Sequence, residues 1–185
     1  MTIEFVSGDL LNPMKEDAIA HGCNCLGSMG AGIAKEIRDR WPFDMTKAYK
    51  RLCSEGWEYP LLGIPNNPIK PGDVQYLKYK NFPLLINMFT QKDIWTQKDG
   101  SPPAKLEWIK KCIENIVDTV VTSKVRTIGM PRIGAGLGGL RWEDVKALMI
   151  EICEPIENVH FVVYEHYVPG VKNEMSEVLQ TRKQG

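Results

Sequence analysis

The chain has 185 residues, which is enough for one domain with a buried core. Its 23 basic and 23 acidic residues leave no net charge, which argues against a general polyanion binder but allows a local anion site. No apolar run approaches the roughly 18 residues that span a bilayer, and the acidic N-terminal segment is unlike a signal peptide. We therefore expect a cytoplasmic protein that does not enter a membrane.

Short apolar segments alternate along the chain with segments of helical periodicity. In chain order, we predict strands at 3–6 and 17–21, helices at 30–40 and 45–54, strands at 73–78 and 82–89, a helix at 106–121, a strand at 125–130, a helix at 142–153 and a strand at 159–164. The polar segment 91–103 is expected to be a surface loop. This order predicts an α/β fold in which helices cover both faces of a largely parallel sheet.

Metal and disulfide chemistry is not expected. The five cysteines are odd in number, and neither they nor the three histidines have the spacing of a zinc site. The sequence predicts no structural metal and requires no cofactor.

Two glycine-rich segments dominate the sequence. The first, HGCNCLGSMGAGI, runs from His21 to Ile33, and the second, PRIGAGLGGL, runs from Pro131 to Leu140. Each follows a predicted strand and leads into a predicted helix, where exposed backbone N–H groups can bind an anion. Ligands of open α/β sheets bind at this end of the strands, so the two segments can hold a diphosphate between them. The alternative is that the glycines only form tight turns.

These segments resemble a known family. Gly8-Asp9-Leu10, Asp17-Ala18-Ile19, the run HGCNCLGSMGAGIA and the run from Gly134 to Leu140 occur in the order typical of the macrodomain family of ADP-ribose binders. The first run is similar to yeast-type ADP-ribose 1''-phosphate phosphatases. The run GAGLGGLRW is similar to the branch that removes ADP-ribose from glutamate or thymidine.

The resemblance covers about residues 2–166, and it implies a three-layer α/β/α macrodomain-like sandwich with a mixed, largely parallel sheet. We expect one macrodomain over 1–168 and a C-terminal tail over 169–185. The tail is long enough to form a short helix, and its last residues are expected to be irregular. The implied ligand is ADP-ribose or a derivative, and the implied partners are ADP-ribosylated protein or DNA.

The resemblance also implies roles for matching residues. Asp9, with the Leu10 backbone beside it, would bind the adenine amino group, and Tyr164 would stack on the adenine ring; from the residues alone, a turn residue and a core aromatic are the alternatives. Backbone N–H groups of two segments would wrap the diphosphate: Ser28, Met29, Gly30, Ala31, Gly32 and Ile33, and Ile133, Gly134, Ala135, Gly136, Leu137 and Gly138.

Two further residues are candidates for catalysis. Asn24 would face the distal ribose, where its amide can bind a hydroxyl or a phosphate oxygen. His21 would act as acid, base or nucleophile toward a phosphomonoester, for which an imidazole is suited. The alternative is a hydrogen-bonded histidine at the end of a strand. We rank phosphatase activity on ADP-ribose 1''-phosphate first.

The alternatives are an ADP-ribosyl hydrolase and a non-catalytic ADP-ribose reader. The hydrolases use a lysine after the strand that matches 82–89, and an alignment without gaps puts that position on Gln91, with Lys92 one residue later. The glutamate-specific branch also has an acid where this chain has Gly138. The loop 91–103, together with Trp95 and Trp108, is a candidate cover for the distal ribose.

Overall fold

The computed structural model describes residues 2–59 and 64–167. Its main feature is a six-stranded sheet in the order β1 (Ile3–Gly8), β8 (His160–Tyr167), β7 (Thr127–Met130), β2 (Ala18–Asn24), β6 (Leu84–Gln91) and β5 (Val74–Leu77). All neighbours pair in parallel except β5, which runs antiparallel to β6. The predicted mixed, largely parallel sheet is confirmed.

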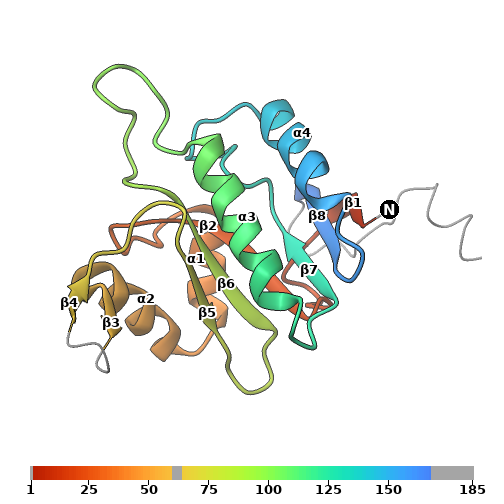
Figure 1. Ribbon diagram of the computed structural model, residues 1–185, viewed down its shortest axis with the longest axis horizontal. Coiled ribbons are helices and arrows are strands. Elements are labelled where there is room, and N and C mark those ends of the chain that lie inside the picture. Colours follow the sequence, from red (N-terminus) through yellow and green to blue (C-terminus); the bar gives the residue numbers. More distant parts are fainter. Residues whose placement is uncertain (1, 60–63, 168–185) are drawn as a thin grey trace, which may run out of the picture.

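Helices cover both faces of this sheet (Figure 1). On one face lie α1 (Gly32–Arg40) and α2 (Phe43–Glu55), and on the other lie α3 (Leu106–Val120) and α4 (Trp142–Cys153). Side chains of a strand alternate between faces, so in β2 Ala18 and Ala20 pack toward α3 and α4 while Ile19 packs toward α1 and α2. The three-layer sandwich is confirmed.

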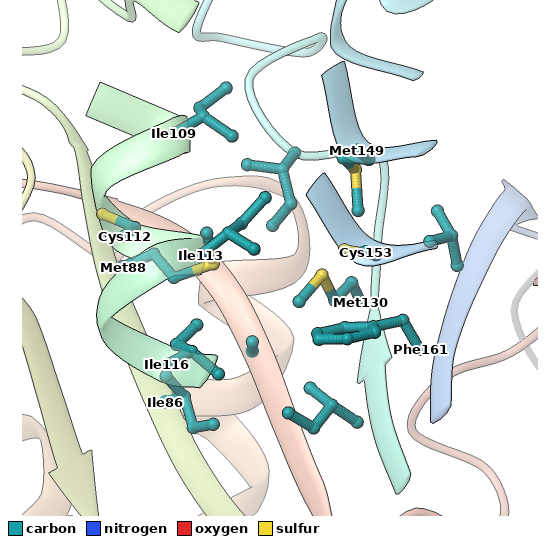
Figure 2. Close-up of a cluster of buried hydrophobic side chains, with 14 of the residues drawn as sticks. Ile86, Met88, Ile109, Cys112, Ile113, Ile116, Met130, Met149, Cys153 and Phe161 are labelled. Carbon is teal, nitrogen blue, oxygen red and sulfur yellow. The ribbon is translucent and has the colours of Figure 1, made fainter. Parts of the chain in front are cut away.

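The layer of α3 and α4 shows how helical periodicity closes the core. Ile109, Ile113 and Ile116 recur at intervals of three or four residues, so they share one face of α3, and all are fully buried. Figure 2 shows this face against Ile86 of β6, beside Met149 and Cys153 of α4. Within the described part of the chain, no helix combines the length and apolarity needed to cross a membrane.

A second, two-stranded sheet was not predicted. It consists of β3 (Trp57–Tyr59) and β4 (Ile64–Asn67), which pair antiparallel after α2. Strands of three and four residues are too short to show alternation in a sequence. The chain before β3 and the end of β4 approach each other so closely that only a glycine fits, because a Cβ at Gly56 would collide with the Asn67 carbonyl. The boundary at residue 168 stays a prediction, and the expected tail, 169–185, lies outside the described residues.

Candidate functional site

A cleft of about 430 Å³ opens where β2, β6 and β7 end. Small-molecule sites in proteins commonly measure roughly 300–1,000 Å³. Its lining comes from the ends of these three strands, from both glycine-rich segments and from the loop after β6: Gly22, Cys23, Asn24, Ser28, Gly30, Ala31, Gly32, Ile33, Ala34, Thr90, Gln91, Ile94, Trp95, Pro131, Arg132, Ile133, Gly134, Gly136, Leu137 and Gly138. The structure thus brings the two predicted segments together on one cleft.

Asn24 shapes the first glycine-rich segment. Its Oδ1 accepts hydrogen bonds from the backbone N–H groups of Leu26 (3.0 Å) and Ser28 (3.1 Å), and its Nδ2 donates to the Ser28 carbonyl (2.9 Å). The Tyr49 hydroxyl of α2 donates to the Asn24 backbone carbonyl at 2.6 Å. Asn24 lines the cleft, and the hydrogen bonds of its side-chain amide stabilise the turn from Asn24 to Ser28. Its contact with a distal ribose stays a prediction.

The N-terminus of α1 faces the cleft without a side-chain cap. Ala31 is the N-cap, in an extended conformation, and it offers no side-chain hydrogen bond. Gly32, Ile33 and Ala34 form the first turn and line the cleft, and no acidic residue lies in this turn. The N–H groups of a first turn have no acceptor within the helix, and the helix dipole adds a partial positive charge there. This end of α1 is suited to an anion.

The second glycine-rich segment is a compact loop that only glycine permits. Gly134 has a φ of +72°, and its carbonyl accepts the Leu140 N–H at 2.9 Å. A Cβ at Gly138 would lie 2.6 Å from the Gly134 carbonyl oxygen. The Gly138 carbonyl in turn accepts the Ala104 N–H at 3.2 Å, which joins this loop to the end of the loop after β6.

The charge of the cleft also favours an anion. Among the described residues that line it, Arg132 is the one cation, and none is a carboxylate. The Arg132 guanidinium lies over the Trp142 ring, 5.3 Å from its centroid. Burial raises the pKa of the Cys23 thiol well above its ordinary value, so this thiol stays protonated at neutral pH. These lining side chains offer no acid–base group that titrates near pH 7.

His21 does not line this cleft. Its side chain is fully buried, and its Nε2 lies 2.7 Å from Oδ1 of Asn87 on β6. Asn87 donates to Gln75 on β5 at 2.9 Å, and Gln75 donates to the Ala48 carbonyl of α2 at 3.3 Å. Because the Asn87 amide nitrogen is the donor toward Gln75, its oxygen is the acceptor and His21 Nε2 carries the proton. His21, Asn87 and Gln75 are direct register partners across three strands.

Burial lowers the pKa of His21 from 6.5 to about 4, although the hydrogen bond with Asn87 opposes this. The imidazole is therefore neutral at pH 7, without a proton to spare as a general acid. To touch a substrate, it would have to leave the buried position that the structure gives it. Direct catalysis by His21 stays a prediction, and the geometry favours the alternative of a hydrogen-bonded histidine that aligns strands.

The predicted adenine contacts lie apart from the cleft lining. Asp9 is buried, and its carboxylate accepts the Leu11 N–H at 2.9 Å. Tyr164 is 1% exposed, and its hydroxyl donates to Glu16 at 2.7 Å, as expected for a core aromatic. Leu10, Met29 and Ala135 are likewise not among the lining residues. The adenine assignments stay predictions.

The loop after β6 decides which of two residues, Gln91 or Lys92, lines the cleft. Gln91 lines the cleft, whereas Lys92 is exposed and does not. Asp93 organises the loop, because its Oδ1 accepts the Trp95 N–H at 2.9 Å and its carbonyl accepts from Gln91 Nε2 at 2.6 Å. Trp95 (70% exposed) on this loop and Leu137 (69% exposed) on the second glycine-rich segment both line the cleft.

Seven lining residues were given no role of their own from the sequence: Gly22, Cys23, Ala34, Thr90, Ile94, Pro131 and Arg132. Thr90 had a signal, since it is a polar residue directly after the predicted strand 82–89. Arg132 is the second residue of the second glycine-rich segment, but an isolated arginine has no pattern of its own.

Comparison with known proteins gives consistent results. The model of the Macro domain family matches residues 20–149. A DNA ADP-ribosyl glycohydrolase of Thermus aquaticus is 30% identical over 163 residues, which are 88% of this chain but 41% of that protein. The chain therefore spans about two fifths of the length of this relative. An ADP-ribose 1''-phosphate phosphatase of Debaryomyces hansenii is 30% identical, over 88% of this chain and 98% of that protein.

Solved structures agree with this. The macrodomain of Mycobacterium tuberculosis DarG superposes with a TM-score of 0.72 at 26% identity, covering 91% of this chain and 98% of that one. The macrodomain of Thermus aquaticus DarG gives 0.70 at 28% identity, covering 88% and 97%.

Proposed function

The chain belongs to the Macro domain family, and on this premise we propose that its cleft binds ADP-ribose and hydrolyses the phosphomonoester of ADP-ribose 1''-phosphate. The observation that carries the proposal is the pairing of two glycine-rich segments with the uncapped N-terminus of α1 on one cleft without carboxylates. Backbone N–H groups from both sides hold the diphosphate. The resemblance to phosphatases extends over nearly the full length of the relative from Debaryomyces hansenii.

The composition of the cleft supports phosphoryl transfer over glycosyl transfer. Water adds to phosphorus, the bond from phosphorus to the ribose oxygen breaks, and inorganic phosphate and ADP-ribose are released. Enzymes catalyse such reactions almost entirely by positioning and charge stabilisation, with little covalent chemistry. A cleft that offers N–H groups, Arg132 and the Gln91 amide, without a titrating base, meets that requirement.

Hydrolysis of ADP-ribose from protein or DNA is the second candidate. The relatives named DNA ADP-ribosyl glycohydrolases favour it. The geometry argues against the lysine that this branch uses, because Gln91 lines the cleft whereas Lys92 is exposed and does not line it.

We propose that the protein acts in the cytoplasm. Its five cysteines are all free thiols, which is in keeping with that location.

The first experiment compares three substrates with the purified chain: ADP-ribose 1''-phosphate, ADP-ribosylated protein and ADP-ribosylated DNA. We expect phosphate release from the first and no release of ADP-ribose from the others. Release of ADP-ribose from a conjugate would favour the second candidate. Binding of ADP-ribose without any turnover would make the protein a reader, and absence of binding would refute the proposal. In the same assay, unchanged turnover of His21→Ala would remove His21 from the mechanism.

Ala31→Asp tests the anion site at α1. An aspartate at this N-cap stabilises the helix by about 1 kcal/mol. It should nevertheless weaken ADP-ribose binding by about fivefold or more, because two unit charges ~4 Å apart repel by about 1 kcal/mol even in water. Ala31→Asn is the control, since it caps the helix without a charge. Equal affinities of the two variants would contradict a diphosphate at this end of α1.

A further inference from the structure

The end of β6 contains an irregularity that places Thr90 apart from its neighbours. Cys23 pairs with Phe89, but the next residue, Asn24, pairs with Gln91, so Thr90 is the extra residue of a β-bulge. Bulges beside functional sites commonly redirect a side chain. Thr90 lines the cleft from this bulge.

The Thr90 hydroxyl is an unsatisfied polar group. The residue is 1% exposed, and within the described part of the chain its Oγ1 has no hydrogen-bond partner. Burying a hydroxyl without a partner destabilises a fold, and native structures rarely keep one without a reason. A valine of similar shape would remove the problem, so the hydroxyl calls for a functional explanation.

Gly22 leaves the space beside this hydroxyl free of side-chain atoms. A Cβ at Gly22 would lie 2.8 Å from Thr90 Oγ1 and 3.8 Å from the Ile133 side chain. A Cβ at position 22 would therefore crowd the hydroxyl, and one of the two would have to shift. Gly22 and Ile133 line the cleft together with Thr90, and they belong to the two segments that we assign to the diphosphate.

We propose that Thr90 Oγ1 hydrogen-bonds a hydroxyl of the distal ribose of ADP-ribose. This rests on the proposed function. A threonine hydroxyl both donates and accepts, which matches a sugar hydroxyl, whereas a phosphate oxygen needs donors alone and finds them in the backbone N–H groups. Ligand binding then satisfies the group that is unpaired in the free protein, and it distinguishes ADP-ribose from ADP, which lacks the distal ribose.

The test measures binding of ADP-ribose and of ADP by calorimetry, for the wild type, Thr90→Val and Thr90→Ser. We expect Thr90→Val to weaken ADP-ribose binding about tenfold, as for the loss of one hydrogen bond in a buried site, with ADP binding unchanged. Thr90→Ser should restore most of the affinity. The melting temperature of Thr90→Val should equal or exceed that of the wild type, because the unsatisfied hydroxyl is gone.

The outcomes separate this inference from the proposal on which it rests. Wild-type affinity of Thr90→Val for ADP-ribose, or an equal loss for ADP and ADP-ribose, would overturn the role of Thr90. Failure of the wild type to bind ADP-ribose would instead overturn the proposed function. If Thr90→Val does not fold, Thr90→Ala carries the same expectation for binding, because it also removes the hydroxyl.

Discussion

Replacement of His21 by asparagine should remove a component of the pH dependence of stability. In the folded protein His21 is fully buried, and burial lowers its pKa from 6.5 to about 4. The unfolded chain therefore binds a proton near pH 6.5 that the folded chain does not bind until about pH 4. Stability from this residue is complete above pH 6.5 and is lost as the pH falls toward 4.

The size of the effect follows from the two pKa values. Between pH 7 and pH 4.5, protonation of His21 in the unfolded state should lower the free energy of unfolding by about 2 kcal/mol, at 1.36 kcal/mol per pKa unit. His21→Asn also loses the hydrogen bond to Asn87, which costs about 1–3 kcal/mol at both pH values. The two contributions are separable because only the first depends on pH.

Urea unfolding at the two pH values, followed by tryptophan fluorescence, measures this. Carboxylates titrate in the same range, but they are common to both proteins and cancel in the difference. The wild type should lose about 2 kcal/mol more than His21→Asn on acidification. Equal losses would show that His21 is not a buried neutral imidazole, and would reopen its direct catalytic role.

Two further predictions concern residues that the sequence left ambiguous. Lys92→Ala should change turnover less than about twofold, because surface substitutions away from a site have small effects; a kinetic assay on ADP-ribose 1''-phosphate checks this, and a large loss would place Lys92 in the mechanism. Tyr164→Phe should lower the free energy of unfolding by about 1–3 kcal/mol, since buried Glu16 loses a donor. Its affinity for ADP-ribose, measured by calorimetry, should be unchanged, and a selective loss of affinity would return Tyr164 to the adenine site.

The parts of this protein that the sequence predicts are those governed by local pattern. The strand–helix alternation gives the three layers, and glycines after buried strands give the cleft. The partner of His21 has no local signal, because Asn87 is 66 residues away and meets it only through the register of β2 and β6. An isolated buried histidine and a catalytic histidine have the same appearance in a sequence.

The choice between Gln91 and Lys92 shows the same limit at finer scale. Successive residues of a strand point to opposite faces, so a shift by one residue exchanges the side chain that enters the site. The bulge at Thr90 makes such a shift in β6. The sequence of β6 contains no pattern that predicts the bulge, because the bulge arises from the pairing of β6 with β2.

The same bulge bears on how one fold can serve different reactions. In the proposed complex, backbone N–H groups hold the diphosphate, and most side-chain substitutions leave such groups in place, so we expect the ligand class to depend on the two glycine-rich segments. We expect the reaction to depend instead on the side chains with which the end of β6 lines the cleft. Here they are the hydroxyl of Thr90 and the amide of Gln91, which can orient a sugar and its phosphate but cannot form the covalent adduct open to a lysine. Substitution at these two positions is therefore where we expect a phosphatase and a glycohydrolase of this architecture to diverge.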